Sequence, residues 1–202
     1  MKFDRRLPLA IVMISLPLMA GSAPGIKNFD QVDSHVYRGG QPTPEGFQHL
    51  AKLGVKTIID LREPGSRSIA EEKTVNSAGM KYVNVPMTGL TAPTEAEITR
   101  ILAMLEDTSS GPVFVHCWRG ADRTGAVIAA YHIDHDNWDC ARALKDAKAH
   151  SMSSFQIPRR NYILSFQPRV VNAKASPAND APSAVVPAAG NASAAAATAA
   201  AN

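Results

Sequence analysis

The residues with the clearest chemical potential are a cysteine and an arginine six positions later, Cys117 and Arg123. The apolar residues 112–115 predict a short buried strand, and the apolar residues 124–131 predict the start of a helix. A loop that joins a strand to a helix N-terminus offers main-chain N–H groups to an anion. A cysteine in such a loop has a lowered pKa, and an arginine there can bind two oxygens of one phosphate. The segment therefore predicts nucleophilic attack on a phosphate ester.

The segment also carries a family resemblance. Residues 116–125, His-Cys-x5-Arg-Thr-Gly, resemble the signature of the cysteine-dependent protein tyrosine and dual-specificity phosphatases. Upstream, residues 36–42 and 54–62 resemble the first strands of small bacterial members, which are similar to plant and fungal atypical dual-specificity phosphatases. The resemblance covers about 140 residues, from near Asn28 to near Arg169. It implies a phosphatase fold and phosphatase activity over most of the chain.

The resemblance assigns roles to the loop. Cys117 is the nucleophile that forms a phosphocysteine, and Arg123 binds the phosphate oxygens and stabilises charge as the bond breaks. Thr124 matches the hydroxyl that stabilises the departing thiolate, although it could equally be an ordinary residue of the first helical turn. His116 orders the loop, and Gly125 allows the helix to pack closely on the sheet. The expected substrate-binding residues are Trp118, Arg119, Gly120, Ala121, Asp122 and Arg123.

The general acid is the point where the sequence departs from the family. Many members carry an aspartate in the loop after the third strand, but residues 86–93 contain no carboxylate and no histidine. One substitute is Asp122, which lies inside the catalytic motif, as in myotubularin-like phosphatases. Its alternative roles are to cap the helix or to pair with Arg123. The other substitute is a carboxylate of the loop that follows residues 60–63. We interpret Asp122 as the general acid and keep the second loop as an alternative.

Bulk properties narrow the class of protein. The formal charge is +3 and no basic stripe contains interleaved aromatic residues, so the sequence gives no case for nucleic acid as a partner. Cys140 is predicted to be a packed apolar residue rather than a disulfide partner of Cys117. His132 and His135 do not have the spacing of a zinc site. We therefore expect neither a metal nor a cofactor, and a phosphorylated protein or small molecule as the substrate.

Both ends of the chain differ from its middle. A positive start, an apolar stretch and small residues near position 20 predict a signal peptide over residues 1–23. Its apolar run is shorter than a bilayer-spanning helix, so we expect export to the periplasm or secretion, with an N-terminal membrane anchor as the alternative. Residues 173–202 are rich in alanine, serine and proline and predict a disordered tail. The phosphatase domain is then expected over residues 24–172.

The middle of the chain alternates strand and helix patterns, which predicts an α/β fold. We expect a central, mostly parallel sheet of four to five strands, flanked by helices. Strands are predicted at residues 36–38, 55–61, 82–85 and 112–115, and helices at residues 44–53, 68–78, 94–105, 124–135, 137–150 and 159–166.

Three functions remain open at this stage. The leading hypothesis is hydrolysis of phosphotyrosine, extending to phosphoserine and phosphothreonine. The same loop chemistry would serve an inositol phosphate or phosphoinositide phosphatase. A phosphate-binding pseudophosphatase is the non-catalytic alternative, since the usual aspartate is missing. A rhodanese-like sulfurtransferase is disfavoured because its cysteine loop is generally one residue shorter.

Overall fold

A five-stranded sheet with the order β1-β2-β5-β3-β4 forms the centre of the computed structural model, which describes residues 23–169. Every neighbouring pair is parallel except β1 and β2, which are antiparallel. The predicted mostly parallel sheet is thereby confirmed. Its strands are β1 (Asp30–Gln31), β2 (Val36–Gly40), β3 (Thr57–Asp60), β4 (Lys81–Asn84) and β5 (Val113–Cys117).

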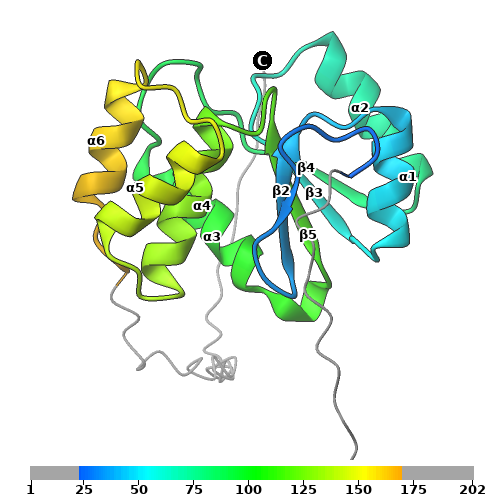
Figure 1. Cartoon of the computed structure of the whole chain (residues 1–202). Helices are drawn as coiled ribbons and strands as arrows, with labels where there is room; N and C mark the ends of the chain where they lie inside the picture. The colour runs from blue at the N-terminus through cyan, green and yellow to red at the C-terminus, as the bar shows by residue number, and fades with distance from the viewer. Residues whose placement is uncertain (1–22, 170–202) are drawn as a thin grey trace, which may run out of the picture. The chain divides into compact units, whose positions relative to one another are not determined.

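Helices cover both faces of this sheet (Figure 1). One face carries the first two helices and the other carries the remaining four, which gives three layers. A short 3-10 helix, η1 (Thr108–Ser110), precedes β5. The α-helices are α1 (Pro44–Lys52), α2 (Ser66–Ser77), α3 (Glu95–Glu106), α4 (Asp122–Asp134), α5 (Cys140–Ala149) and α6 (Ile157–Ser165).

Helix caps explain where several helices begin. Thr43 accepts a hydrogen bond from the N–H of Gly46 and precedes Pro44, so α1 begins where it was predicted. Thr94 and Glu97 form the expected capping box at the start of α3. The predicted start of α5 at Asn137 is wrong. Asn137 has a φ of +57°, and Asp139 caps the helix by accepting the N–H of Arg142.

The strand β5 lies in the middle of the sheet, where both of its faces are buried. Its side chains contribute to a core with α3 and α4 on one face, and Phe114 contributes to a core with α1 and α2 on the other. The register places Cys117 opposite Gly40 of β2, and His116 opposite Asp60 of β3. The carboxyl ends of β2, β3 and β5 therefore meet at one edge, which is where ligands bind in α/β sheets.

The structure does not test the predicted signal peptide or the predicted C-terminal tail. Of the predicted signal peptide, only Ala23 falls within the described residues, and the predicted tail at residues 173–202 lies outside them. Within residues 23–169, no helix combines the length and apolar composition needed to cross a bilayer.

Candidate active site

The catalytic loop, residues 117–123, joins the end of β5 to the first turn of α4. Gly120 has a φ of +70°, a conformation that glycine adopts without strain. Its carbonyl oxygen accepts hydrogen bonds from Asn28 Nδ2 at 2.9 Å and from Arg38 Nη2 at 3.0 Å. Two side chains from before and within β2 thus fix the middle of the loop.

Arg38 is an unusual strand residue because its guanidinium is almost fully buried. It forms an ion pair with Asp146 of α5 at 3.5 Å while it binds Gly120. Burial lowers the pKa of Arg38 to about 10, and the charges of Asp146, Asp30 and Cys117 counteract part of that effect. Arg38 therefore ties the catalytic loop to both the sheet and α5 while it remains a cation at neutral pH.

Cys117 is buried, with 3% of its surface exposed. Burial by itself raises the pKa of the thiol, but hydrogen bonding from Thr124, the charge of Arg123 and the amide of Gly120 outweigh it. The net effect is a pKa of Cys117 below its ordinary value. The buried Thr124 hydroxyl has no other hydrogen-bond partner among the described residues, so it is available to the sulfur. These contacts favour a thiolate nucleophile.

Arg123 connects the catalytic loop with the loops that follow two other strands. Its Nη1 donates to the carbonyl oxygens of Leu61 and Met87, both at 3.3 Å. Leu61 follows β3, and Met87 lies in the loop after β4. The guanidinium is therefore held where the strand ends converge, on the same loop as Cys117.

Asp122 and Arg119 contact each other at the outer side of the loop. Asp122 Oδ2 accepts from Arg119 Nη2 at 2.7 Å, and Oδ1 accepts from the N–H of Ser153 at 2.8 Å. The Arg119 side chain is 64% exposed. Both carboxylate oxygens are thus engaged, so Asp122 must release one contact before it can donate a proton.

The loop of residues 86–93, which lacks a carboxylate, is held by Arg159 of α6. Arg159 is fully buried and its Nη1 donates to the carbonyl of Gly89 at 2.8 Å and to Gln156 Oε1 at 2.6 Å. Its Nη2 donates to the carbonyl of Thr88. Burial and the neighbouring charge of Arg123 lower the pKa of Arg159. This arginine fixes the loop in which the family resemblance led us to look for a general acid.

A buried ionic network supports the loop from the side of α2. His116 Nε2 lies 2.7 Å from Glu71 Oε1, and Arg62 Nη2 lies 2.5 Å from Glu71 Oε2. Arg62 also donates to Asp60 through Nε and Nη2, at 2.8 and 2.6 Å. Tyr82 donates to Asp60 Oδ2 at 2.7 Å. His116, which precedes Cys117, is therefore connected to β3, β4 and α2.

The charges of this network balance without a metal ion. Burial lowers the pKa of the His116 imidazole, but the pairing with Glu71 and the charge of Asp60 more than compensate, so the pKa is raised. When His116 is protonated, it and Arg62 neutralise the carboxylates of Asp60 and Glu71. Asp60, Glu71 and His116 lie close enough together to share an ion, but their acceptor atoms already face Arg62 and each other. The group fits an ion-pair network better than a metal site.

Replacing Glu71 with glutamine is expected to destabilise the fold by about 3 kcal/mol, because it leaves buried charges without their partner. The raised pKa of His116 means that its pairing stabilises the folded state below the ordinary value of 6.5. That contribution is lost as the pH rises through the raised value. Urea denaturation of the wild type and the Glu71→Gln variant should therefore show a larger difference at about pH 6 than at about pH 9. A difference that does not change with pH would contradict this account of His116.

Pockets flank the catalytic loop on two sides. One, of about 630 Å³, is lined by Lys27, Asn28, Gln41, Trp118 and Arg119, among others. The other, of about 460 Å³, is lined by Arg62, Glu63, Arg67, Trp118 and Arg123, among others. Trp118, whose surface is half exposed, borders both pockets.

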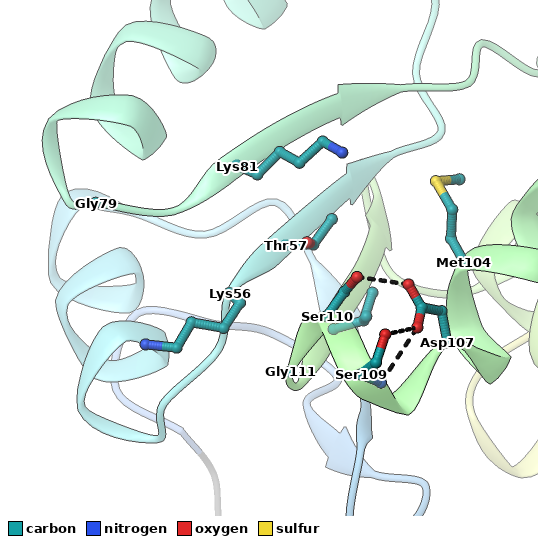
Figure 2. A pocket seen from close by; sticks show the side chains of 10 residues that line it. Lys56, Thr57, Gly79, Lys81, Met104, Asp107, Ser109, Ser110 and Gly111 are labelled. Atoms are coloured by element: carbon teal, nitrogen blue, oxygen red, sulfur yellow. Dashed lines mark hydrogen bonds between the residues drawn. The ribbon is translucent and has the colours of Figure 1, made fainter.

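Figure 2 shows a further pocket, whose lining includes none of the residues of the loop at positions 117–123. It is lined by Thr57, Lys81 and Val113, which are the first residues of β3, β4 and β5, whereas Cys117 is the last residue of β5. Its only carboxylate, Asp107, accepts hydrogen bonds from Ser109 and Ser110. This pocket therefore lies at the opposite end of the strands and does not form part of the candidate site.

The site contains residues that the sequence motif does not reveal: Asn28, Arg38, Glu71 and Arg159. A charged residue in the apolar pattern of residues 36–40 is the one local signal that could have identified Arg38. Glu71 lies in a helix that exposes many charged residues and offers no comparable signal.

Comparison with known proteins now identifies the family. A family model described as DSP-PTPase phosphatase fused to NAD+ kinase matches residues 10–164. The probable chloroplastic NAD kinase 2 of Oryza sativa subsp. japonica is 29% identical over 119 residues, which are 57% of this chain and 12% of that protein. The inositol diphosphatase DSP3 of Arabidopsis thaliana is 26% identical over 143 residues, or 69% of this chain and 70% of that protein. This chain therefore spans only a small part of the plant NAD kinase that it matches.

Solved structures show the same fold. The crystal structure of Pseudomonas aeruginosa TpbA matches with a TM-score of 0.61 and 21% identity, over 72% of this chain and 92% of that one. The core catalytic domain of the Saccharomyces cerevisiae PP-IP phosphatase SIW14 matches with a TM-score of 0.63 and 23% identity, over 72% and 89%. Because the family model covers more than half of the sequence, the chain belongs to the DSP-PTPase family of cysteine-based dual-specificity and protein tyrosine phosphatases.

Proposed function

We propose that this protein hydrolyses phosphomonoesters, including phosphotyrosine, through a phosphocysteine intermediate. One observation carries the proposal. Cys117, whose pKa is lowered, and Arg123 lie on one loop at the carboxyl ends of the central strands. A thiolate nucleophile beside a fixed guanidinium is the arrangement that phosphoryl transfer to a cysteine requires.

The proposed reaction has two steps. The Cys117 thiolate forms a bond to phosphorus, and the bond from phosphorus to the ester oxygen breaks. That oxygen leaves with a proton from a general acid, and the alcohol or phenol is released. Water then attacks the phosphorus of the phosphocysteine and gives a proton to the carboxylate of the general acid. The bond from sulfur to phosphorus breaks, inorganic phosphate leaves, and both the thiolate and the acid are restored. Arg123 binds the phosphate oxygens in both steps, and the Thr124 hydroxyl stabilises the departing thiolate.

We retain Asp122 as the proposed general acid. To act, its carboxyl must release Arg119, whose side chain is 64% exposed and can turn out into solvent. The remaining contact with the N–H of Ser153 would keep the side chain in place. The other candidate is Glu63, an exposed residue that lines the same pocket as Arg123.

The Asp122→Asn variant should lose activity in a way that depends on the leaving group. General acids contribute about 100- to 10,000-fold when the leaving oxygen needs a proton. We expect a loss of about 100-fold in kcat/KM with an alkyl phosphate, but only a few-fold with p-nitrophenyl phosphate. The Glu63→Gln variant, assayed in parallel, should show no such difference. If the loss depended on the leaving group in Glu63→Gln and not in Asp122→Asn, Glu63 would be the general acid.

A second candidate function is hydrolysis of inositol phosphates or phosphoinositides. Arg119 and Arg123 on the loop and Arg67 beside it would attract a polyanion. A related Arabidopsis protein is named an inositol diphosphatase. The chemistry of Cys117 and Arg123 would be the same for this substrate class.

Hydrolysis of p-nitrophenyl phosphate by the full chain, in the presence of reductant, tests the proposed activity. The substrate has a good leaving group, so turnover does not depend on the identity of the acid. The Cys117→Ser variant should retain less than about one thousandth of the wild-type rate. The Cys140→Ser variant is the matched control and should retain activity. A wild-type protein that binds phosphate without turnover would instead indicate a pseudophosphatase.

A further inference from the structure

The pocket between the catalytic loop and α2 contains a cation that the proposed reaction does not use. Its walls include Arg123 and Trp118 of the catalytic loop, and Arg62, Glu63 and Arg67 from the segment between β3 and α2 and from the start of α2. Arg123 is committed to the scissile phosphate, and Arg62 is paired with Asp60 and Glu71. Arg67 therefore remains as the cation available to a ligand.

Arg67 is held in place by Trp118 rather than by a carboxylate. Its guanidinium carbon lies 4.6 Å from the centroid of the Trp118 ring. Among residues 23–169, its side chain has no ion pair or hydrogen bond. An arginine stacked on an aromatic face keeps its N–H groups free to bind an anion. Trp118 follows the nucleophile directly, so this cation stands next to the reaction centre.

Two other features of the pocket favour an anion. The side chain of Arg62 is 8% exposed, and its Nη1 has no hydrogen-bond partner among the described residues. Arg62 therefore contributes a largely buried cation to the wall of the pocket, although Asp60 and Glu71 share its charge. The twelve-residue helix α2 also begins here, and its N-terminal dipole attracts negative charge. The one opposing group, Glu63, is exposed to solvent.

We propose that this pocket is a subsite for a second phosphate group of the substrate, which Arg67 binds while the scissile phosphate occupies the catalytic loop. The inference rests on the proposed phosphatase function and extends it to a substrate class. The favoured substrate carries two phosphate groups a few bonds apart, which a singly phosphorylated tyrosine does not. Arg67 and Trp118 are then residues that determine specificity.

Binding of inorganic phosphate and inorganic tripolyphosphate to the full chain tests the subsite without any turnover. Titration calorimetry on the Cys117→Ser protein should show at least about tenfold tighter binding of tripolyphosphate than of phosphate. Adding Arg67→Ala should remove most of that preference while phosphate still binds. Adding Arg67→Met, which keeps an apolar contact with Trp118 but no charge, should give the same result. The Lys73→Ala substitution removes a charge elsewhere on α2 and should leave the preference intact.

Three results would contradict the proposed phosphate subsite at Arg67. Equal affinity for the two anions would show that no second phosphate is bound. A preference that survives in both Arg67 variants would place the binding elsewhere. An equal loss in the Lys73→Ala control would mean that the overall charge of the protein, and not this pocket, attracts the polyanion. Failure of the phosphatase proposal would be seen separately, as absence of p-nitrophenyl phosphate hydrolysis by the wild type.

Discussion

An Arg123→Lys variant is expected to lose about 100- to 1,000-fold in kcat/KM for p-nitrophenyl phosphate. Lysine keeps the positive charge, but it cannot bind two phosphate oxygens with a planar pair of donors. It also cannot reproduce the geometry with which Arg123 donates to the carbonyls of Leu61 and Met87. Steady-state kinetics with purified protein measures the effect.

The size of the loss in kcat/KM shows whether Arg123 acts through the geometry of its guanidinium or through its positive charge alone. The same substitution at Arg100, an exposed residue of α3, changes a surface arginine in the same way and should leave kcat/KM unchanged. If Arg123→Lys retained activity within about tenfold of the wild type, charge alone would account for the role of Arg123. Bidentate binding of the phosphate would then be rejected.

A Gly120→Ala variant is expected to lose both stability and activity. A Cβ atom at this position would lie 2.3 Å from the carbonyl carbon of Gly39 and 2.5 Å from the nitrogen of Gly40, both of which belong to the main chain of β2. The catalytic loop would have to move away from β2 to remove this steric overlap. That movement would also break the hydrogen bonds from Asn28 and Arg38 to the Gly120 carbonyl. We expect a cost of about 3 kcal/mol or more, which corresponds to a fall in Tm of about 6–12 °C.

Gly79→Ala is the matched control for that experiment. Gly79 has a φ of +74°, close to that of Gly120, but no atom lies within 4 Å of the position of a Cβ. Its replacement should cost only the strain of the left-handed conformation, about 1–2 kcal/mol, and should leave activity intact. Thermal unfolding of both variants checks the comparison. Equal losses of stability would show that the close contact with β2 is not what fixes the loop.

The sequence predicts the strand, the loop and the helix start around Cys117 well because their signals are local. A buried strand, a cysteine, a glycine and a helix start follow one another within a short segment, and each constrains the backbone by itself. The caps at Thr43 and Thr94 were predicted for the same reason. The two-residue strand β1 was not predicted, since it is too short to show any periodicity and forms only by pairing with β2.

The supporting residues could not be predicted because their partners lie far away in the sequence. Glu71 faces His116 across 45 positions, and Asn28 reaches Gly120 across 92. Arg159 acts on a loop about 70 positions earlier. Nothing in the local pattern of α2 or α6 distinguishes these residues from surface charges. Only the sheet order, which places β5 between β2 and β3, brings them to the loop.

The central claim is that Cys117 forms a covalent bond to phosphorus during turnover. Rapid acid quench of the wild-type protein during hydrolysis of p-nitrophenyl phosphate, followed by mass spectrometry of its peptides, tests that claim directly. We predict a phosphate group on the peptide that contains Cys117, none on the peptide that contains Cys140, and none on either peptide in the Cys117→Ser variant. Steady turnover with no phosphate on Cys117, or with phosphate on a different residue, would contradict the mechanism.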